Sequence, residues 1–431
     1  MQNQSHLLRS KRFLPLFVTQ FFGAFNDNVF KNAFLIWFTY DIANKLNMNA
    51  QLMVTIASGL FVLPFFLFSS LAGQLADKFE KSKLVQIIKI AEILIMIFAF
   101  VGFHFENINL LLCLIFLMGV HSTFFGPLKY SLLPEHLKNN ELVSGNALIE
   151  GGTFLAILLG TILGGIVIRF TNGIELISIS VISFALIGWI ASRSIPKAPS
   201  ADPRLVISFN IFSQTLKIIS FAKKEKTVWL SIIGISWFWF IGITFLSQFP
   251  TYTKNLINGD EFIVTLFLSI FSIGIGIGSV ICNKLLKGKI NGRLVPAGSI
   301  GITIGIAIFC IANYFYVTPE KIISLEEFFS NSYHSWLITL GLLVMAISSG
   351  IYIVPLYAIM QHRSDAKYLS RIIAANNVLN ALLMVISSIA IVALTKLKIN
   401  LLQIFLLLAA TNILVFFIIR NIVNKNLSHH A

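Results

Sequence analysis

Residues 23–31 place two opposite charges inside an otherwise apolar segment. Asp27 and Lys31 stand four positions apart, and the amides of Asn26 and Asn28 flank the carboxylate. This spacing puts both charges on one face of a helix. A charge near the middle of a bilayer costs at least about 2.5–3.5 kcal/mol, so it should face a cavity or a partner. We expect these four residues to contact a substrate. A self-neutralising pair that only bonds neighbouring helices is the alternative.

A second polar group lies in the apolar segment that opens with Arg371. Asn376, Asn377 and Asn380 fall within five residues, and the first and last share a helix face. Amides in a membrane are costly unless they meet water, a ligand or another helix. We expect these asparagines to line a cavity and hydrogen-bond a substrate, with attachment between helices as the alternative.

Glu150 is a further carboxylate within an apolar segment, and it follows Asn146 by one helical turn. We expect it to bind substrate or take part in gating, although a lock between helices would use the same two groups. Glu92 follows Lys89 by three residues, which predicts a local surface pair. His121 is expected to be a satisfied hydrogen-bonding partner, with a proton relay as the less favoured interpretation.

Residues 73–83 carry a glycine, an aspartate and several lysines where one apolar segment ends and the next begins. Gly73 permits close approach of two helices, and Asp77 can pair with a basic residue or cap a neighbouring helix. The lysines are expected to stay in water beneath an anionic leaflet. An ordinary basic loop is the alternative. The predicted gating residues are Gly73, Asp77, Lys78, Lys81, Lys129 and Arg371.

Motifs for catalysis are missing from the sequence. It holds no His-Glu-x-x-His, Walker A or Gly-x-Ser-x-Gly pattern, and the nearest approach to an acyltransferase His-x4-Asp dyad is His136 with Glu141. The three cysteines are dispersed without metal-ligand spacing and are expected to be buried small apolar residues. We therefore expect no enzyme activity, no cofactor and no metal.

The composition of the chain predicts that membrane-spanning helices hold these residues in place. The 431 residues are 56% hydrophobic and only 12% charged, with a net charge of +14. Soluble domains carry about 25% charged residues, so a cytosolic enzyme, a disordered chain and a disulfide-stapled module are excluded. A membrane helix needs roughly 20 apolar residues, and twelve such segments fit. The predicted spans are 13–40, 51–75, 84–103, 108–128, 142–170, 174–192, 227–252, 261–285, 294–316, 335–360, 370–395 and 400–420.

The hydrophilic stretch 193–226 divides these spans into two halves, 1–192 and 227–431. Placing both termini in the cytoplasm puts 25 Lys and Arg inside and six outside, as the positive-inside rule requires. The same rule explains the net charge of +14, so we expect no nucleic-acid partner. The first apolar run is too long for a cleavable signal peptide.

The two halves also resemble each other in sequence. Gly126-Pro127 in the first half corresponds to Val354-Pro355 in the second, which indicates a duplication of six spans. Gly126-Pro127 is expected to bend or break its helix.

Several motifs resemble known families. The Gly73–Lys83 loop resembles the signature of the major facilitator superfamily. Residues 25–28 (Phe-Asn-Asp-Asn), 125–130 (Phe-Gly-Pro-Leu-Lys-Tyr) and 146–153 (Asn-Ala-Leu-Ile-Glu-Gly-Gly-Thr) resemble bacterial lysophospholipid transporters. The match extends to the transporter half of the fused 2-acylglycerophosphoethanolamine acyltransferase/acyl-carrier-protein synthetases. The resemblance implies an all-α membrane protein of twelve transmembrane helices in two pseudo-symmetric halves.

The resemblance also implies a function: alternating-access transport of lysophospholipid, chiefly lysophosphatidylethanolamine, across a bacterial inner membrane towards the cytoplasmic leaflet. The expected partners are that amphiphile, membrane lipid and a separate acyltransferase, with the chain acting as a monomer. The buried charges match a zwitterionic headgroup, with Asp27 and Glu150 near the amine and Lys31 near the phosphate. The alternatives are a proton-coupled carrier of a siderophore, drug or metabolite and, from another class, a membrane-embedded acyltransferase or its non-transporting subunit.

Overall fold

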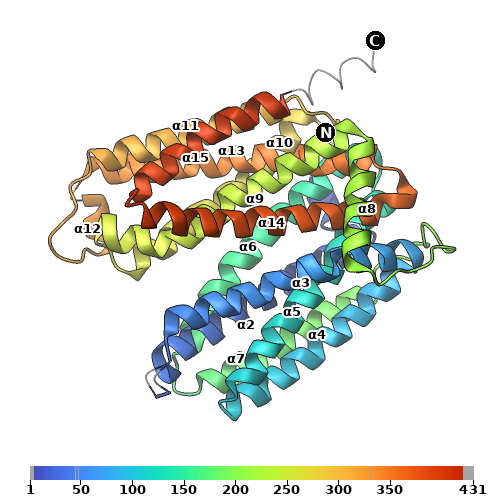
Figure 1. Ribbon diagram of the computed structural model, residues 1–431, viewed down its shortest axis with the longest axis horizontal. Coiled ribbons are helices and arrows are strands. Elements are labelled where there is room, and N and C mark those ends of the chain that lie inside the picture. The colour runs from blue at the N-terminus through green and yellow to red at the C-terminus, as the bar shows by residue number, and fades with distance from the viewer. Residues whose placement is uncertain (1–3, 44, 47, 331, 421–431) are drawn as a thin grey trace. The chain divides into compact units, whose positions relative to one another are not determined.

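The computed structural model describes residues 4–43, 45–46, 48–330 and 332–420, which are mostly helical (Figure 1). The predicted C-terminal half runs to residue 431, and residues 421–431 lie outside this description. The long helices of the first half are α2 (Leu14–Trp37), α3 (Ala50–Lys78), α4 (Lys81–His104), α5 (Ile108–His136), α6 (Leu142–Val167) and α7 (Gly173–Ser192). Those of the second half are α9 (Lys226–Tyr252), α10 (Glu261–Leu286), α11 (Val295–Tyr314), α13 (Tyr333–Arg363), α14 (Leu369–Lys396) and α15 (Leu401–Ile419).

Each predicted span corresponds to one of these helices, which confirms the twelve-helix all-α architecture. Eleven helices of the described chain are long and apolar enough to cross a membrane. The twelfth, α2, has 24 residues and carries Asp27 and Lys31. Local chemistry sets several starts, because side chains at the cap accept hydrogen bonds from first-turn amides. The caps of this kind include Asn49, Asn107, Asp260 and Asn400.

Helix α5 differs from the sequence prediction. The span was expected to end at residue 128, with Gly126-Pro127 bending or breaking the helix, but α5 continues through Pro127 and Pro134 to His136. Proline removes one backbone donor without ending a membrane helix when neighbouring helices enclose it. In the polar stretch between α7 and α9, residues Ile211–Lys224 form the helix α8. Two short helices complete the set, α1 (Gln4–Leu7) and α12 (Leu325–Ser330).

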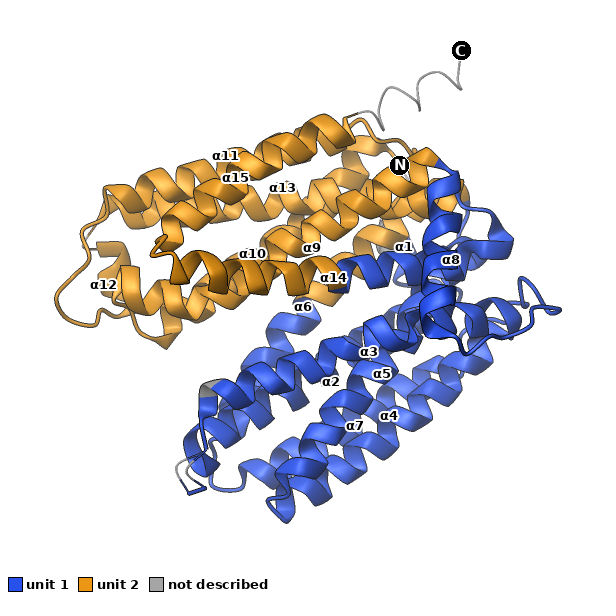
Figure 2. Cartoon of the chain, in the orientation of Figure 1, with its two compact units in different colours: residues 1–138, 155–225, 364–381 blue, residues 139–154, 226–363, 382–431 orange. Residues whose placement is uncertain are grey.

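The chain divides into two compact units that interleave the two halves of the sequence (Figure 2). Unit 1 comprises residues 1–138, 155–225 and 364–381, and unit 2 comprises residues 139–154, 226–363 and 382–431. The beginning of α6 therefore belongs with second-half helices. The first half of α14 belongs with first-half helices.

Each unit is closely packed. In unit 1, α2 packs on α7, α3 on α5, and α4 on both α5 and α7. In unit 2, α13 packs on α9, α10 and α11. Gly278 of α10 lies against the backbone of Ile347, where a Cβ would overlap it. Stacked rings add to the unit 2 core, with centroids of Phe245 and Phe405 4.4 Å apart. The repeated glycines of α10 thus serve tight helix packing.

Candidate functional site

One buried polar group of unit 1 is a set of four side chains that we call the charged cluster: Asn26, Lys89, Glu92 and His121. The Lys89 Nζ lies 2.6 Å from Glu92 Oε2, and both side chains are 0% exposed. The Asn26 Nδ2 donates to Glu92 Oε1 at 3.0 Å, and His121 Nε2 lies 3.2 Å from Glu92 Oε2. Three side chains, Asn26 of α2, Lys89 of α4 and His121 of α5, therefore converge on the Glu92 carboxylate.

Small residues make room for the Lys89 ammonium. A Cβ at Gly23 of α2 would lie 2.6 Å from Lys89 Nζ, and one at Gly188 of α7 would lie 3.7 Å away. The face of the Phe125 ring lies 5.1 Å from Nζ, which adds a cation–π contact. The prediction of a surface pair for Lys89 and Glu92 is therefore wrong. Helices α2, α5 and α7 pack over this face of α4 and bury both charges.

Asp27 and Lys31, which we call the open pair, are only partly buried. Asp27 Oδ2 accepts a hydrogen bond from Ser122 Oγ at 2.6 Å, and Lys31 Nζ lies 5.3 Å from the Phe61 ring centroid. Among the ion pairs of the described chain, none includes either residue. The shared helix face does not make them a bonded pair, since each side chain has a different neighbour.

The remaining predicted substrate residues are distributed over both units. Asn28 donates to the carbonyl of Ala24 in its own helix at 2.8 Å. Asn376, Asn377 and Asn380 all lie in the part of α14 that belongs to unit 1 and are buried. Asn377 packs on α5, because a Cβ at Gly126 would lie 2.6 Å from its Nδ2.

Asn376 is 0% exposed, and neither its Oδ1 nor its Nδ2 has a hydrogen-bond partner among the described residues. A buried amide without partners costs free energy, so this position has a polar group that the rest of unit 1 leaves unsatisfied.

Glu150 is fully buried in the part of α6 that belongs to unit 2. One turn earlier, Asn146 exchanges two hydrogen bonds with Gln361 of α13, at 2.6 and 3.1 Å. Asn146 is thus committed to a reciprocal amide pair. No partner for Asn146 was predicted from the sequence, although Gln361 is an amide within an apolar segment and such amides usually need a hydrogen-bonding partner.

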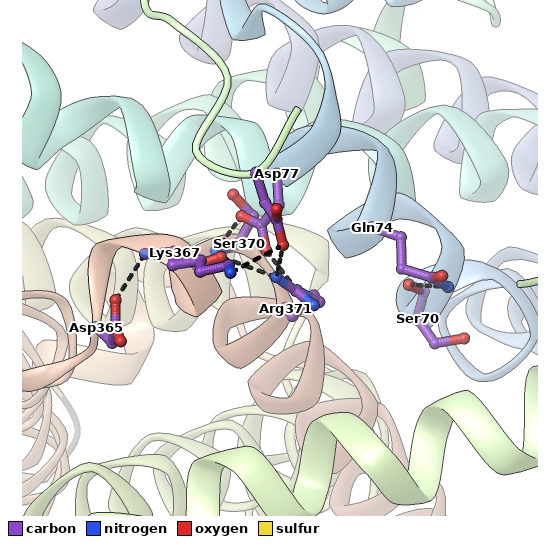
Figure 3. A network of polar contacts seen from close by, with 8 residues as sticks. Ser70, Gln74, Asp77, Asp365, Lys367, Ser370 and Arg371 are labelled. Carbon is purple, nitrogen blue, oxygen red and sulfur yellow. Dashed lines mark hydrogen bonds and ion pairs between the residues drawn. The ribbon is translucent and has the colours of Figure 1, made fainter. Parts of the chain in front are cut away.

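The predicted gating residues centre on a network between α3 and α14 within unit 1 (Figure 3). Asp77 accepts hydrogen bonds from the Ser370 amide at 3.1 Å and from Arg371 Nε at 2.7 Å. Arg371 also reaches Asp202 of the linker at 3.4 Å and the Lys367 carbonyl at 2.9 Å. We call these five residues the α3–α14 network.

Gly73 permits this contact. A Cβ at Gly73 would lie 2.8 Å from Ala374 Cβ and 2.9 Å from Arg371 Cα. Van der Waals contact needs more than 3 Å, so only glycine fits without displacement of α14. Asp202 was not identified from the sequence, because a charge in a hydrophilic linker carries no signal of its partner.

The predicted gating lysines have two kinds of environment. Lys78 lies 5.7 Å from the Phe79 ring and Lys129 4.6 Å from the Tyr130 ring, and both are partly exposed. Lys81 contradicts the expectation that these lysines stay in water. It is buried and donates to Glu135 Oε1 at 3.1 Å, because the linker covers the turn between α3 and α4.

The linker is attached at Glu80, next to Lys81. The Glu80 carboxylate accepts hydrogen bonds from the amides of Ala198, Ser82 and Lys83 at 2.9 Å. Partial burial opposes ionisation of Glu80, but these hydrogen bonds outweigh it and hold the pKa of the carboxyl below its ordinary value of 4.5.

The thiols differ in exposure. Cys282 and Cys310 are buried as expected, but the same expectation is wrong for Cys113, which is exposed.

Comparison with known proteins gives one family and a consistent set of folds. The model of the Major Facilitator Superfamily matches residues 16–388. A lysophospholipid transporter named LplT from Serratia proteamaculans is 26% identical over 366 residues, which cover 83% of this chain and 81% of the relative. The Escherichia coli O1:K1 protein of the same name is 26% identical over 369 residues, with 83% and 81% coverage.

Two solved structures share the fold at low identity. The human organic anion transporter MFSD10 (TETRAN) is 12% identical with a TM-score of 0.72, covering 95% of this chain and 99% of that one. The transporter FucP in its outward conformation is 12% identical with a TM-score of 0.71, covering 95% and 97%.

Proposed function

Because the chain belongs to the Major Facilitator Superfamily, we propose that this secondary transporter moves a lysophospholipid of the lysophosphatidylethanolamine class across a bacterial inner membrane. Transport runs by alternating access towards the cytoplasmic leaflet, with both termini in the cytoplasm. The chain acts as a monomer, and a separate acyltransferase re-acylates the product. The names of the relatives support the cargo, and the bias of Lys and Arg supports the orientation.

The open pair carries this proposal. Asp27 and Lys31 lie one turn apart on α2, are partly exposed and take part in no ion pair within 4.0 Å among the described residues. A zwitterionic headgroup offers an ammonium to the carboxylate and a phosphate to the ammonium. Two unneutralised charges are costly in a membrane, so their retention favours a cargo that brings the complementary charges.

Neutral hydrogen-bonding groups complete the proposed site. Asn376 has donor and acceptor atoms that no described residue satisfies, so it is suited to glycerol or phosphate oxygens. Asn26 supports the site indirectly, since its amide is bound to Glu92. Asn28, Asn377 and Asn380 are proposed as additional hydrogen-bonding groups. Glu150 is proposed to face the amine in one state of the cycle.

Uptake of labelled lysophosphatidylethanolamine by spheroplasts tests the cargo and the role of the open pair. We expect Asp27→Ala and Lys31→Ala each to lower uptake roughly tenfold or more, the effect of losing one charge-assisted interaction. Lys45→Ala, which removes an exposed lysine, is the matched control. Wild-type uptake by both variants would refute the assignment. Transport that collapses with an uncoupler and ignores lysophospholipid would indicate the proton-coupled carrier instead.

The α3–α14 network is proposed as the cytoplasmic gate, and the two sequence halves joined by residues 193–226 as the moving bundles. Gly73→Val tests the gate, because the added side chain overlaps α14 and should reduce uptake several-fold. Gly59→Val is the matched control on the same helix, since a Cβ there meets nothing within 4 Å. Equal uptake by the two variants would contradict a role of this contact in transport.

A further inference from the structure

A groove on unit 1 combines two unpaired basic side chains with exposed isoleucines. It lies between the first turns of α4 and the last turns of α7, with a volume of about 340 Å³. Its lining consists of Lys83, Gln86, Ile87, Ile90, Trp189 and Arg193. None of these residues belongs to the charged cluster, the open pair or the α3–α14 network.

The two helices present one face each to the groove. The four α4 residues have the spacing i, i+3, i+4, i+7. Trp189 of α7 and its C-cap residue Arg193, which keeps a helical backbone conformation, have the spacing i, i+4, so each set shares a face. Helices α4 and α7 pack together. Because the first turns of α4 and the last turns of α7 line the same groove, the start of α4 at Lys81 lies beside the end of α7 at Ser192. Lys83 and Arg193 therefore lie at one end of the groove, and Ile87 and Ile90 lie along it.

The cations at this end are available for a ligand. Lys83 and Arg193 are exposed, and neither takes part in an ion pair of the described chain. The Arg193 Cζ lies 5.3 Å from the Trp189 ring centroid, so the ring holds the guanidinium at the groove mouth. Glu80 is the nearby acid, and its carboxylate is bound to the amides of Ser82, Lys83 and Ala198.

The apolar end faces outward. Ile87 is 62% exposed and Ile90 45% exposed, values suited to contact with lipid tails. From Lys83 to Ile90 the helix rises about 10 Å. The interfacial region of one leaflet is about 5–7 Å deep, so a phosphate at Lys83 places an acyl chain along the isoleucines. Tryptophan is enriched at this depth because its ring is apolar and its N–H is polar.

We propose that this groove binds an anionic phospholipid of the cytoplasmic leaflet, with its phosphate between Lys83 and Arg193 and a chain along Ile87 and Ile90. No acidic residue lines the groove, so its two positive charges favour a lipid with net negative charge over a zwitterionic one. This lipid is a resident ligand rather than the cargo, and its binding does not depend on the transported molecule.

Native mass spectrometry of the purified full chain, titrated with phosphatidylglycerol or phosphatidylethanolamine, tests the proposal. We expect phosphatidylglycerol to bind more tightly, and the double variant Lys83→Gln/Arg193→Gln to bind it roughly 30-fold more weakly. Arg204→Gln/Lys289→Gln is the matched control, because it removes the same charge at exposed positions outside the groove. The melting temperature of each variant establishes that it is folded.

Two further variants distinguish the contribution of the charges to lipid binding from that of the apolar surface and from a loss of folding. Lys83→Arg/Arg193→Lys should retain binding, and Ile87→Ser/Ile90→Ser should weaken it with both charges in place. The proposal is overturned if Lys83→Gln/Arg193→Gln binds phosphatidylglycerol like the wild type, or if the wild type binds both lipids equally. Displacement of the lipid by millimolar inorganic phosphate would also overturn it, since a free anion would then be the ligand.

Discussion

Two sets of opposite charges occupy the interior of unit 1, and they differ in how fully they are neutralised. In the charged cluster, Lys89 and Glu92 meet at 2.6 Å with no exposed side-chain surface. Asp27 and Lys31 of the open pair are partly exposed, and neither forms an ion pair among the described residues; Asp27 accepts a hydrogen bond from Ser122, and Lys31 lies near the ring of Phe61. The first arrangement fixes helices to one another. The second leaves both charges outside the ion pairs of the described residues, which is the arrangement that the proposed headgroup site requires.

Removal of one member of the charged cluster should have the largest effect on stability. Glu92→Ala leaves Lys89 buried without its counter-ion and should lower the free energy of unfolding by about 3–5 kcal/mol. Unfolding in detergent, followed by tryptophan fluorescence during titration with sodium dodecyl sulfate, measures this. The double variant Lys89→Met/Glu92→Leu should recover most of the loss, because it removes both charges together.

An exposed pair provides the control for this prediction. Lys45 and Glu106 lie 3.4 Å apart with side chains 60% and 52% exposed, so Glu106→Ala should change the free energy of unfolding by at most about 1 kcal/mol. If Glu92→Ala were as mild as Glu106→Ala, the charged cluster would not hold the helices together.

The open pair should show a smaller effect on stability. Asp27→Asn retains an acceptor for Ser122, and Lys31→Gln removes a charge that forms no ion pair within 4.0 Å among the described residues, so each variant should unfold within about 1 kcal/mol of the wild type. The same detergent titration measures both. A loss as large as that of Glu92→Ala would show that the open pair is structural and would remove the contrast with the charged cluster.

The smallest expected effect is a pH-dependent one at Glu80, outside the spans. Because the folded-state pKa of Glu80 is lowered, its carboxylate stabilises the folded state above pH 4.5, and this contribution is lost as the pH falls through the folded-state pKa. The wild type should therefore melt at a higher temperature than Glu80→Gln at neutral pH, with the difference shrinking below pH 4.5. A difference independent of pH would mean that ionisation of Glu80 does not hold the linker.

The positions of the spans were predictable because each helix must cover the same apolar thickness. The predicted segments 261–285 and 174–192 match α10 and α7 within a residue. Segment 108–128 was predicted too short, since Pro127 is a strong local signal for a helix end. Packing of α5 in its unit overrides that signal.

The α3–α14 network was partly predictable, because a glycine at position 73 permits close approach of two helices and Asp77 can pair with a basic residue such as Arg371. Asp202 was not, since its role depends on how the linker folds back onto α3.

The sequence by itself determined that the chain is a membrane protein of twelve helices, since apolar length and charge distribution are read residue by residue. It also located Asp27 and Lys31 within the first apolar segment. Only the tertiary structure decided which charges are neutralised: Lys89 and Glu92 became a buried pair because α2, α5 and α7 enclose that face of α4, while Asp27 and Lys31 remained apart. Helical spacing defines which side chains share a face, but the neighbouring helices decide whether that face meets another side chain or open space.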